Sequence, residues 1–97
     1  MAKATLLFEI KRQFDDGHMF QARIWRVPNP VRGSSHTLKY SLYYGRKGSR
    51  LLGYDNEAGK GDHRHYGDHE EAYSFTSIDQ LVSDFLTDLD ALRGGDK

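Results

Sequence analysis

Apolar and polar side chains alternate along the first part of the chain. Residues 4–14 follow this alternation, and residues 18–27 repeat it after the turn signal Asp15-Asp16-Gly17. A period of two residues is typical of a β-strand that buries one face. A short Asp/Gly segment between two such runs favours a hairpin. The pattern therefore predicts two antiparallel strands at the start of the chain.

Two further strands are predicted after a loop at residues 28–37, which contains both prolines. Residues 38–46 are rich in tyrosine and residues 51–54 in leucine and tyrosine, a composition that suits a half-buried sheet. Residues 55–71 are dense in Asp, Glu, His and Gly and contain almost no core residues. We interpret that segment as a His-rich loop.

A helical pattern follows the loop. Ser77 is the predicted N-cap, with Gln80 three residues later completing a capping box, and Gly94-Gly95 is expected to end the helix. The helix is therefore predicted over residues 77–93. Its buried stripe, with apolar residues three and four positions apart, consists of Ile78, Leu81, Val82, Phe85, Leu86, Leu89 and Leu92.

These elements predict an α+β fold, with a four-stranded, mainly antiparallel sheet over residues 4–54 and one C-terminal helix packed on a face of the sheet. A length of 97 residues suits a single domain over residues 1–97. The absence of cysteine excludes disulfides, a cysteine nucleophile and a thiolate zinc site. The sequence contains neither an apolar run of about 20 residues nor the pattern of a signal peptide. We therefore expect a cytoplasmic protein that does not enter a membrane.

The net charge of zero conceals an uneven distribution. Residues 1–53 contain ten Lys or Arg and three Asp or Glu, whereas residues 54–97 contain four Lys or Arg and eleven Asp or Glu. One half could offer a basic surface to phosphates and the other an acidic surface to a partner protein. Alternatively, the two halves attract each other within the fold.

The candidate chemistry lies in the His-rich segment, where three of the five histidines fall within residues 63–69. If this segment is extended, His63 and His65 share one face. Two imidazoles can act as general base and general acid near neutral pH. They can also bind a metal together with His69 or Asp62. Lys60 and Arg64 could hold a phosphate and stabilise the charge that develops on it.

The same segment also allows a simpler interpretation. His-X-His pairs occur by chance on surface strands, and a turn at Gly67-Asp68 would direct His69 away from the other two histidines or over them. Tyr54, Tyr66 and Tyr73 could stack on unpaired bases, although tyrosines on strands more often pack in a core. We interpret Trp25 as a core or partner contact, and we assign no function to His18 and His36.

At this segment the chain resembles the TumE-like toxins of bacterial and archaeal toxin–antitoxin pairs. The Lys60–His65 run, Lys-Gly-Asp-His-Arg-His, is the most specific part of the resemblance. The other matching residues are Tyr54-Asp55-Asn56, Gly59, Glu70-Glu71, Tyr73, Phe75-Thr76-Ser77, the leucine-rich helix, the 27–34 segment Val-Pro-Asn-Pro-Val-Arg-Gly-Ser, and Lys39-Tyr40. The resemblance implies a small growth-inhibiting protein that is held in check by a helix-turn-helix antitoxin.

From the motif we predict a toxin that cleaves RNA without a metal or other cofactor. His63 and His65 form the predicted acid/base pair, Lys60 and Arg64 bind the phosphate, and Asp62 orients a histidine. The predicted substrate-binding residues are Tyr54, Tyr66, Arg46 and Lys39. The two basic residues of this set are expected to attract the RNA backbone, together with Arg23, Arg26, Lys47 and Arg50. The alternatives are a metal-dependent nuclease and a non-enzymatic module that blocks its target. The acidic helix and exposed apolar residues also favour a partner protein or a homodimer.

Overall fold

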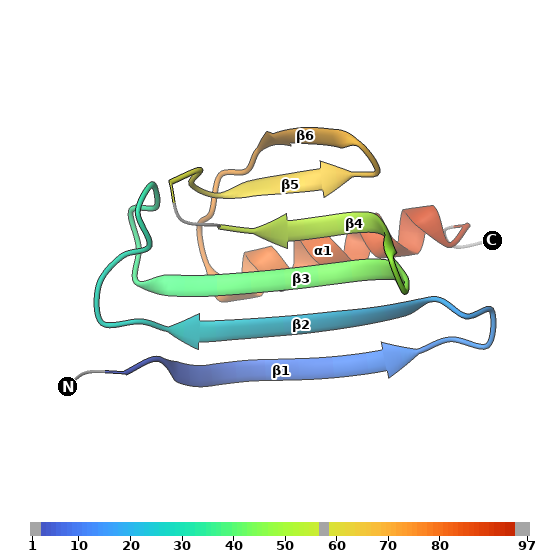
Figure 1. Cartoon of the computed structure of the whole chain (residues 1–97), viewed down its shortest axis with the longest axis horizontal. Helices are drawn as coiled ribbons and strands as arrows, with labels where there is room; N and C mark the ends of the chain where they lie inside the picture. Colours follow the sequence, from blue (N-terminus) through green and yellow to red (C-terminus); the bar gives the residue numbers. More distant parts are fainter. Residues whose placement is uncertain (1–2, 57–58, 95–97) are drawn as a thin grey trace.

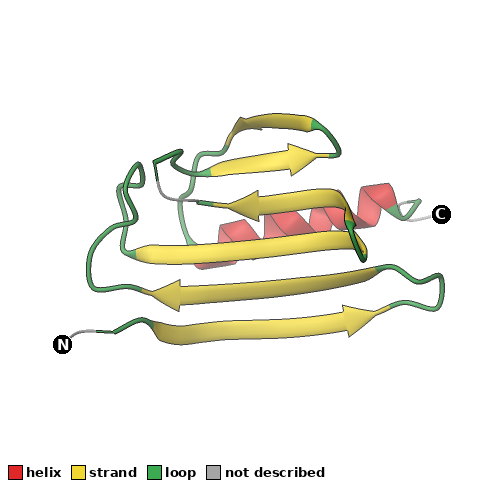
Figure 2. Cartoon of the chain, in the orientation of Figure 1, coloured by secondary structure: helices red, strands yellow, loops and turns green. Residues whose placement is uncertain are grey.

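Six strands form one antiparallel sheet in which each strand pairs with the next along the chain (Figures 1 and 2). The computed structural model describes residues 3–56 and 59–94. The strands are β1 (Thr5–Gln13), β2 (Met19–Arg26), β3 (Leu38–Arg46), β4 (Ser49–Asp55), β5 (His63–Tyr66) and β6 (His69–Ala72), and the helix α1 spans Ile78–Leu92. The α+β class and the C-terminal helix on one face are confirmed, and so is the predicted first hairpin.

The prediction of four strands was wrong, because β5 and β6 lie inside the segment interpreted as a loop. The expected turn at Gly67-Asp68 is present and joins them as a hairpin, with Gly67 at φ +57°. The missed strands carry almost no apolar side chains, and the buried positions of β5 are His63 and His65. A hydrophobic pattern therefore could not reveal these strands, because the buried positions of β5 carry histidine rather than apolar residues.

The helix begins as the sequence predicts. Ser77 is the N-cap, and its hydroxyl accepts a hydrogen bond of 3.1 Å from the backbone N–H of Gln80. The Gln80 side chain does not return to the cap but donates to Asp84 at 2.7 Å, so only half of the predicted capping box forms. Gly94 follows the helix at φ +102°; Gly95 lies outside the described residues.

Helix α1 covers one face of the sheet and builds the core with it (Figure 1). The buried core residues are Phe20, Ala22, Ile24, Tyr40, Leu42, Tyr44, Leu52, Tyr54, Leu81, Phe85 and Leu89. Along the strands, these core residues alternate with residues whose side chains point to the opposite side of the sheet. No helix in the described residues is long and apolar enough to cross a membrane.

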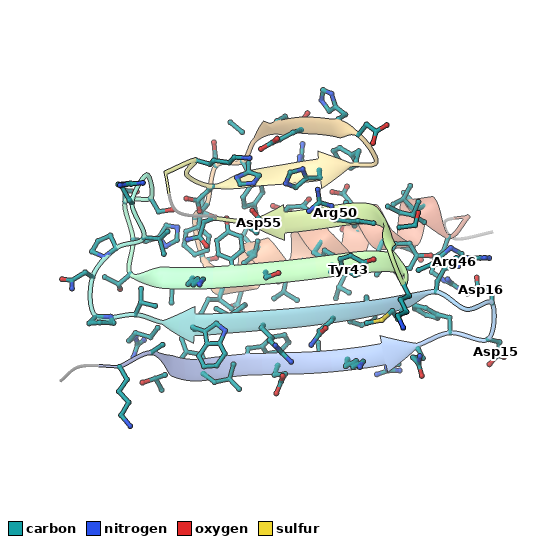
Figure 3. All side chains as sticks on the ribbon, in the orientation of Figure 1. Asp15, Asp16, Tyr43, Arg46, Arg50 and Asp55 are labelled. Carbon is teal, nitrogen blue, oxygen red and sulfur yellow. The ribbon has the colours of Figure 1, made fainter. Side chains whose placement is uncertain are left out.

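The opposite side of the sheet, called here the open face, is turned toward the viewer in Figure 3, where α1 lies behind the strands. Strand alternation and register assign its residues, because directly paired residues of an antiparallel sheet share a face. They include Glu9 and Lys11 of β1, Gln21, Arg23 and Trp25 of β2, Lys39, Ser41 and Tyr43 of β3, Gly53 and Asp55 of β4, His63 and His65 of β5, and Glu70 and Ala72 of β6.

Candidate functional site

His63 and His65 lie side by side on the open face, as the i, i+2 spacing predicts. Their ring centroids are 4.7 Å apart and the rings are nearly perpendicular. The sheet register places Asp55 of β4 opposite His63 and Gly53 opposite His65. Both histidines are buried, with exposed fractions of only 4% and 8%. A strand pair therefore brings two imidazoles and one carboxylate together at a sheltered position.

The hydrogen bonds of His63 constrain where its protons are. Its Nδ1 lies 2.9 Å from the carbonyl oxygen of Gly61, and because a carbonyl can only accept, this nitrogen carries a hydrogen. Its Nε2 lies 2.7 Å from Asp55 Oδ1 and 3.4 Å from Glu70 Oε2. Two carboxylates therefore face this ring nitrogen, a place that suits a hydrogen-bond donor or a cation.

The contact between His63 and Asp55 is short but is not a well-oriented hydrogen bond. Within residues 3–56 and 59–94, Asp55 Oδ1 has no hydrogen-bond partner of good geometry, although His63 Nε2 lies 2.7 Å away. A buried carboxylate oxygen without a donor is costly. Asp55 therefore depends on positive charge nearby, whether on the imidazole or on a bound cation.

His65 is in a different electrostatic environment. Its Nε2 lies 3.9 Å from Asp55 Oδ2. Burial, together with the positive charge of Arg50, lowers the pKa of His65 despite the opposing effect of Asp55. His65 is thus held neutral at neutral pH and can accept a proton.

Arg50 reaches the site by lying across Gly53. A Cβ added at Gly53 would stand 2.8 Å from Arg50 Cδ, so the glycine leaves the space that the arginine side chain occupies. Figure 3 shows Arg50 and Asp55 on β4 beside Tyr43 of β3. An exposed guanidinium next to two histidines can bind a phosphate and stabilise negative charge on it.

The same residues could hold a metal ion. The ligand atoms of Asp55, His63 and His65 all lie within 4.8 Å of one another. The hydrogen bond from His63 Nδ1 to a backbone carbonyl is the outer contact that usually orients a metal-binding histidine. The third candidate ligand is thus Asp55, in place of the His69 or Asp62 that the sequence suggested.

Asp62 lies elsewhere and joins two loops. It accepts hydrogen bonds from Ser34 Oγ at 2.6 Å and Tyr40 Oη at 2.7 Å, and its Oδ2 lies 2.7 Å from His36 Nε2. Burial opposes the charged form, but these bonds prevail and lower the pKa of Asp62. The histidine that Asp62 contacts is therefore His36, which the sequence had presented as incidental, and not a member of the candidate site.

Arg64 and the tyrosines assigned to substrate binding face α1. Arg64 pairs with Glu71 at 2.6 Å and donates to Tyr54 Oη at 3.2 Å. Tyr54 is fully buried and donates to Asp88, as does Tyr66 at 2.8 Å. Tyr54 therefore packs in the core and cannot stack on a base, and Arg64 is on the wrong side of the sheet to contact the His pair.

The exposed predicted residues are spread around the molecule. Lys60 lies in the loop before β5 and Lys39 on the open face, and both are exposed. Arg46 lies at the far end of β3 near Asp16 (Figure 3) and donates to the Asp16 carbonyl at 3.3 Å. His69 is opposite Tyr66 in the register and its side chain lies 3.1 Å from Glu71, so it does not join His63 and His65.

The sequence did not assign Asp55 or Glu70 to the chemistry, and it gave Arg50 only a general attraction for RNA. Asp55 belongs to a strand eight residues before His63, and only the β4–β5 pairing brings the two together. Strand alternation after Leu52 and Tyr54, extended one residue further, would have placed Asp55 on the same side as Gly53. The sequence carries no comparable signal for Glu70.

Comparison with known proteins shows a family that matches most of the chain. The family described as Toxin TumE matches residues 3–93 of this chain. No curated protein and no solved structure matches it.

Proposed function

The chain belongs to the TumE toxin family, and from this premise we propose that it is the toxin of a toxin–antitoxin pair and an endoribonuclease whose catalytic centre is the His pair on the open face. The observation that carries the proposal is the contact set of His63 and His65. Nε2 of His63 faces the carboxylates of Asp55 and Glu70. His65 is buried beside Arg50, and the pKa of His65 is lowered. Such a pair places a neutral imidazole that can accept a proton beside a second imidazole that can donate one.

These groups match the steps of metal-independent RNA cleavage. Neutral His65 accepts the proton of the ribose 2′-hydroxyl, whose oxygen attacks the adjacent phosphorus. The bond from phosphorus to the 5′-oxygen breaks, and the imidazolium of His63 donates a proton to that leaving oxygen. The products are a 2′,3′-cyclic phosphate and a free 5′-hydroxyl. Arg50 neutralises the charge that builds on the phosphate oxygens, and Asp55, 2.7 Å from His63 Nε2, positions that ring.

The test compares cleavage of single-stranded RNA by the purified wild type, His63→Ala and His65→Ala. Each single variant should lose about 10²- to 10⁴-fold in rate, the usual contribution of one acid/base group. His69→Ala is the matched control, because His69 lies in the same hairpin but is 66% exposed and faces away from the pair. It should cleave as the wild type does.

Growth of an inducible host separates catalysis from blocking. Wild-type protein should stop growth, and the His63→Ala/His65→Ala double variant, at matched soluble expression, should not. Growth arrest by the double variant would overturn the catalytic proposal and favour a toxin that blocks its target by binding.

A metal-dependent nuclease is the second candidate, favoured by the convergence of Asp55, His63 and His65 within 4.8 Å. A metal there would polarise the phosphate and bind the attacking oxygen. Its ligands would use the nitrogen lone pairs that proton transfer needs, so the two mechanisms exclude each other. Cleavage that persists in excess chelator supports proton transfer by the histidines. Cleavage lost in chelator and restored by one divalent ion supports the metal.

The proposal includes a helix-turn-helix antitoxin as partner. A groove beside α1 supports this, because its lining combines apolar and acidic side chains. Phe8, Val82 and Leu86 are among its apolar residues, and Asp79 and Asp90 are its acidic ones. An amphipathic antitoxin segment with basic residues along its edge would fit this surface.

Leu86→Glu should weaken capture of the antitoxin. Leu51→Glu should not, since Leu51 is similarly exposed, 37% against 44%, but lies outside the groove. Unchanged capture would exclude this groove. A concentration-dependent dimer of the wild type that Leu86→Glu dissociates would instead assign the groove to a second copy of the chain.

A further inference from the structure

A pocket on the open face is not used by the proposed chemistry. It lies between β2 and β3 and encloses about 200 Å³. Trp25 and Tyr43 contribute aromatic rings to it, and Arg23 and Lys39 contribute positive charge. Gln21, Tyr40 and Ser41 complete the lining. Two aromatic rings interleaved with two cations are the combination on which single-stranded nucleic acid binds.

The pocket is built by cross-strand pairing. Trp25 lies opposite Lys39, and Arg23 lies opposite Ser41. The Tyr43 hydroxyl donates to the Arg46 carbonyl at 2.6 Å, and the Arg23 guanidinium donates to Glu9 at 2.8 Å. These bonds hold two walls of the pocket in place before any ligand arrives, which reduces the entropy lost on binding.

Trp25 is notable because it is only partly buried on a face that α1 does not cover. Packing explains the aromatic residues of the other face, where Tyr40 and Tyr54 are 2% and 0% exposed within the core. It does not explain a partly exposed tryptophan at a strand position that alternates with Ile24. A large aromatic side chain in such a position is typical of a binding surface.

Rows of paired residues on the open face lead from the pocket to the candidate catalytic centre. Ser41 lies opposite Asp55, and Asp55 lies opposite His63, so one row of the sheet joins the pocket to the His pair. The next row joins Tyr43 through Gly53 to His65. Neighbouring strands are about 4.8 Å apart, so β3 lies about 10 Å from β5. One short strand of RNA can therefore occupy both places.

We propose that this pocket binds an unpaired nucleobase of the RNA substrate next to the cleaved phosphate; the proposal rests on the RNA-cleaving function above. The base stacks on Trp25, the Gln21 amide and Ser41 hydroxyl bond to its edge, and Lys39 contacts the neighbouring phosphate. A base within a duplex is stacked on its neighbours and cannot enter. The pocket thus selects single-stranded RNA.

Trp25 is the only tryptophan of the chain, so its fluorescence reports on this pocket directly. The wild type is titrated with a short 2′-O-methyl RNA of mixed sequence, which has no 2′-hydroxyl proton to lose and is not cleaved. An end label on the RNA reports total binding by anisotropy. We expect Trp25 fluorescence to be quenched along the same binding curve. The corresponding duplex should bind more weakly and quench little.

Substitutions supply the second arm. Trp25→Ala should weaken single-strand binding by about 10- to 100-fold, the size expected for loss of one stacked base, and Trp25→Phe should retain most of the affinity. Lys39→Ala should weaken binding more than Lys47→Ala, which removes the same charge from a turn outside the pocket. Circular dichroism of each variant confirms that it is folded.

The outcomes distinguish this pocket from the function on which it rests. RNA that binds by anisotropy while Trp25 fluorescence and Trp25→Ala affinity stay unchanged would overturn the pocket and leave the nuclease standing. An absence of both binding and cleavage would overturn the nuclease and the pocket with it. Equal quenching by duplex and single strand would overturn the selection for unpaired bases.

Discussion

Replacing Asp62 by alanine tests whether this residue holds the fold or takes part in the chemistry. The substitution removes the carboxylate that accepts from Ser34 and Tyr40 and lies 2.7 Å from His36 Nε2. Three groups then lose one shared acceptor. Loop 28–37 also loses its side-chain attachment through Asp62 to the segment before β5, while the hydrogen bond from the Gly59 N–H to the Arg32 carbonyl remains.

The size of the effect follows from the number of bonds and their burial. A hydrogen bond to a charged group contributes about 1.5–3 kcal/mol. The Asp62 side chain is 11% exposed and that of His36 17%, so water replaces part of what is lost. We expect a loss of about 2–4 kcal/mol in the free energy of unfolding, from a total of about 5–15 kcal/mol for a domain of this kind. At about 4–8 °C per kcal/mol, Tm falls by about 8–30 °C.

Urea unfolding followed by circular dichroism measures this loss. Asp68→Ala is the control, because it removes the same charge from an exposed position in the β5–β6 turn and should change stability by less than about 0.5 kcal/mol. The folded pKa of Asp62 is lowered, so its stabilisation is complete above the unfolded value of about 3.9 and is lost as pH falls below it. The difference between wild type and Asp62→Ala should therefore shrink in acid.

A different result would refute the structural role. If Asp62→Ala unfolds with the wild-type midpoint yet loses RNA cleavage by 10²-fold or more, Asp62 acts in the chemistry, as the sequence alone suggested. If stability falls as expected and cleavage at a temperature where the variant is folded is preserved, Asp62 belongs to the scaffold.

Three further predictions address the site and the core. Tyr54→Phe should lower the free energy of unfolding by about 1–3 kcal/mol in urea titrations, because Arg64 and Asp88 lose a shared partner. Its RNA affinity should stay unchanged, and weakened affinity in the folded variant would contradict the place of Tyr54 in the core. Arg50→Ala should lower the cleavage rate by about 10²-fold with Arg50→Lys between it and the wild type, whereas equal rates would exclude a role on the phosphate. Because the pKa of His65 is lowered, kcat/KM should stay high below the usual histidine value of about 6.5 and fall only as His65 becomes protonated at lower pH; a decline centred above 6.5 would refute the assignment of His65 as base.

Hydrophobic periodicity predicts the parts of this fold that bury apolar side chains and misses the part that does not. The first hairpin and α1 follow the expected periods of two and of three to four residues. The β5–β6 hairpin buries His63 and His65 instead of apolar residues, and its outer strand is His-Glu-Glu-Ala. Backbone pairing joins β5 to β4 and β6 to β5, and ion pairs such as Arg64 with Glu71 join β5 to β6. Neither has a periodic signature in the sequence.

The candidate site divides in the same way. The pairing of His63 with His65 follows from alternation within one strand and was predicted. Asp55 and Arg50 come from a neighbouring strand, and their approach depends on the register between β4 and β5. Register is set by the whole sheet, so a local spacing could not reveal it.

Alternation along the most specific motif, Lys60–His65, explains why its residues do different work. Gly61 lies so close to the preceding loop that a Cβ on Gly33 would stand 2.7 Å from its backbone nitrogen. Asp62 anchors that loop, and Arg64 binds Glu71 on the side of α1. Only His63 and His65 face the open side.

If the proposed function holds, loss of toxicity on substituting a residue of this run has two physical causes. On the open face it should report lost chemistry. At Gly61, Asp62 and Arg64 it reports loosening of the scaffold that presents the histidines, and lower unfolding free energy should accompany it. Measuring stability and cleavage together for each position separates the two causes, and the division should follow the two faces of β5 rather than the order of the motif.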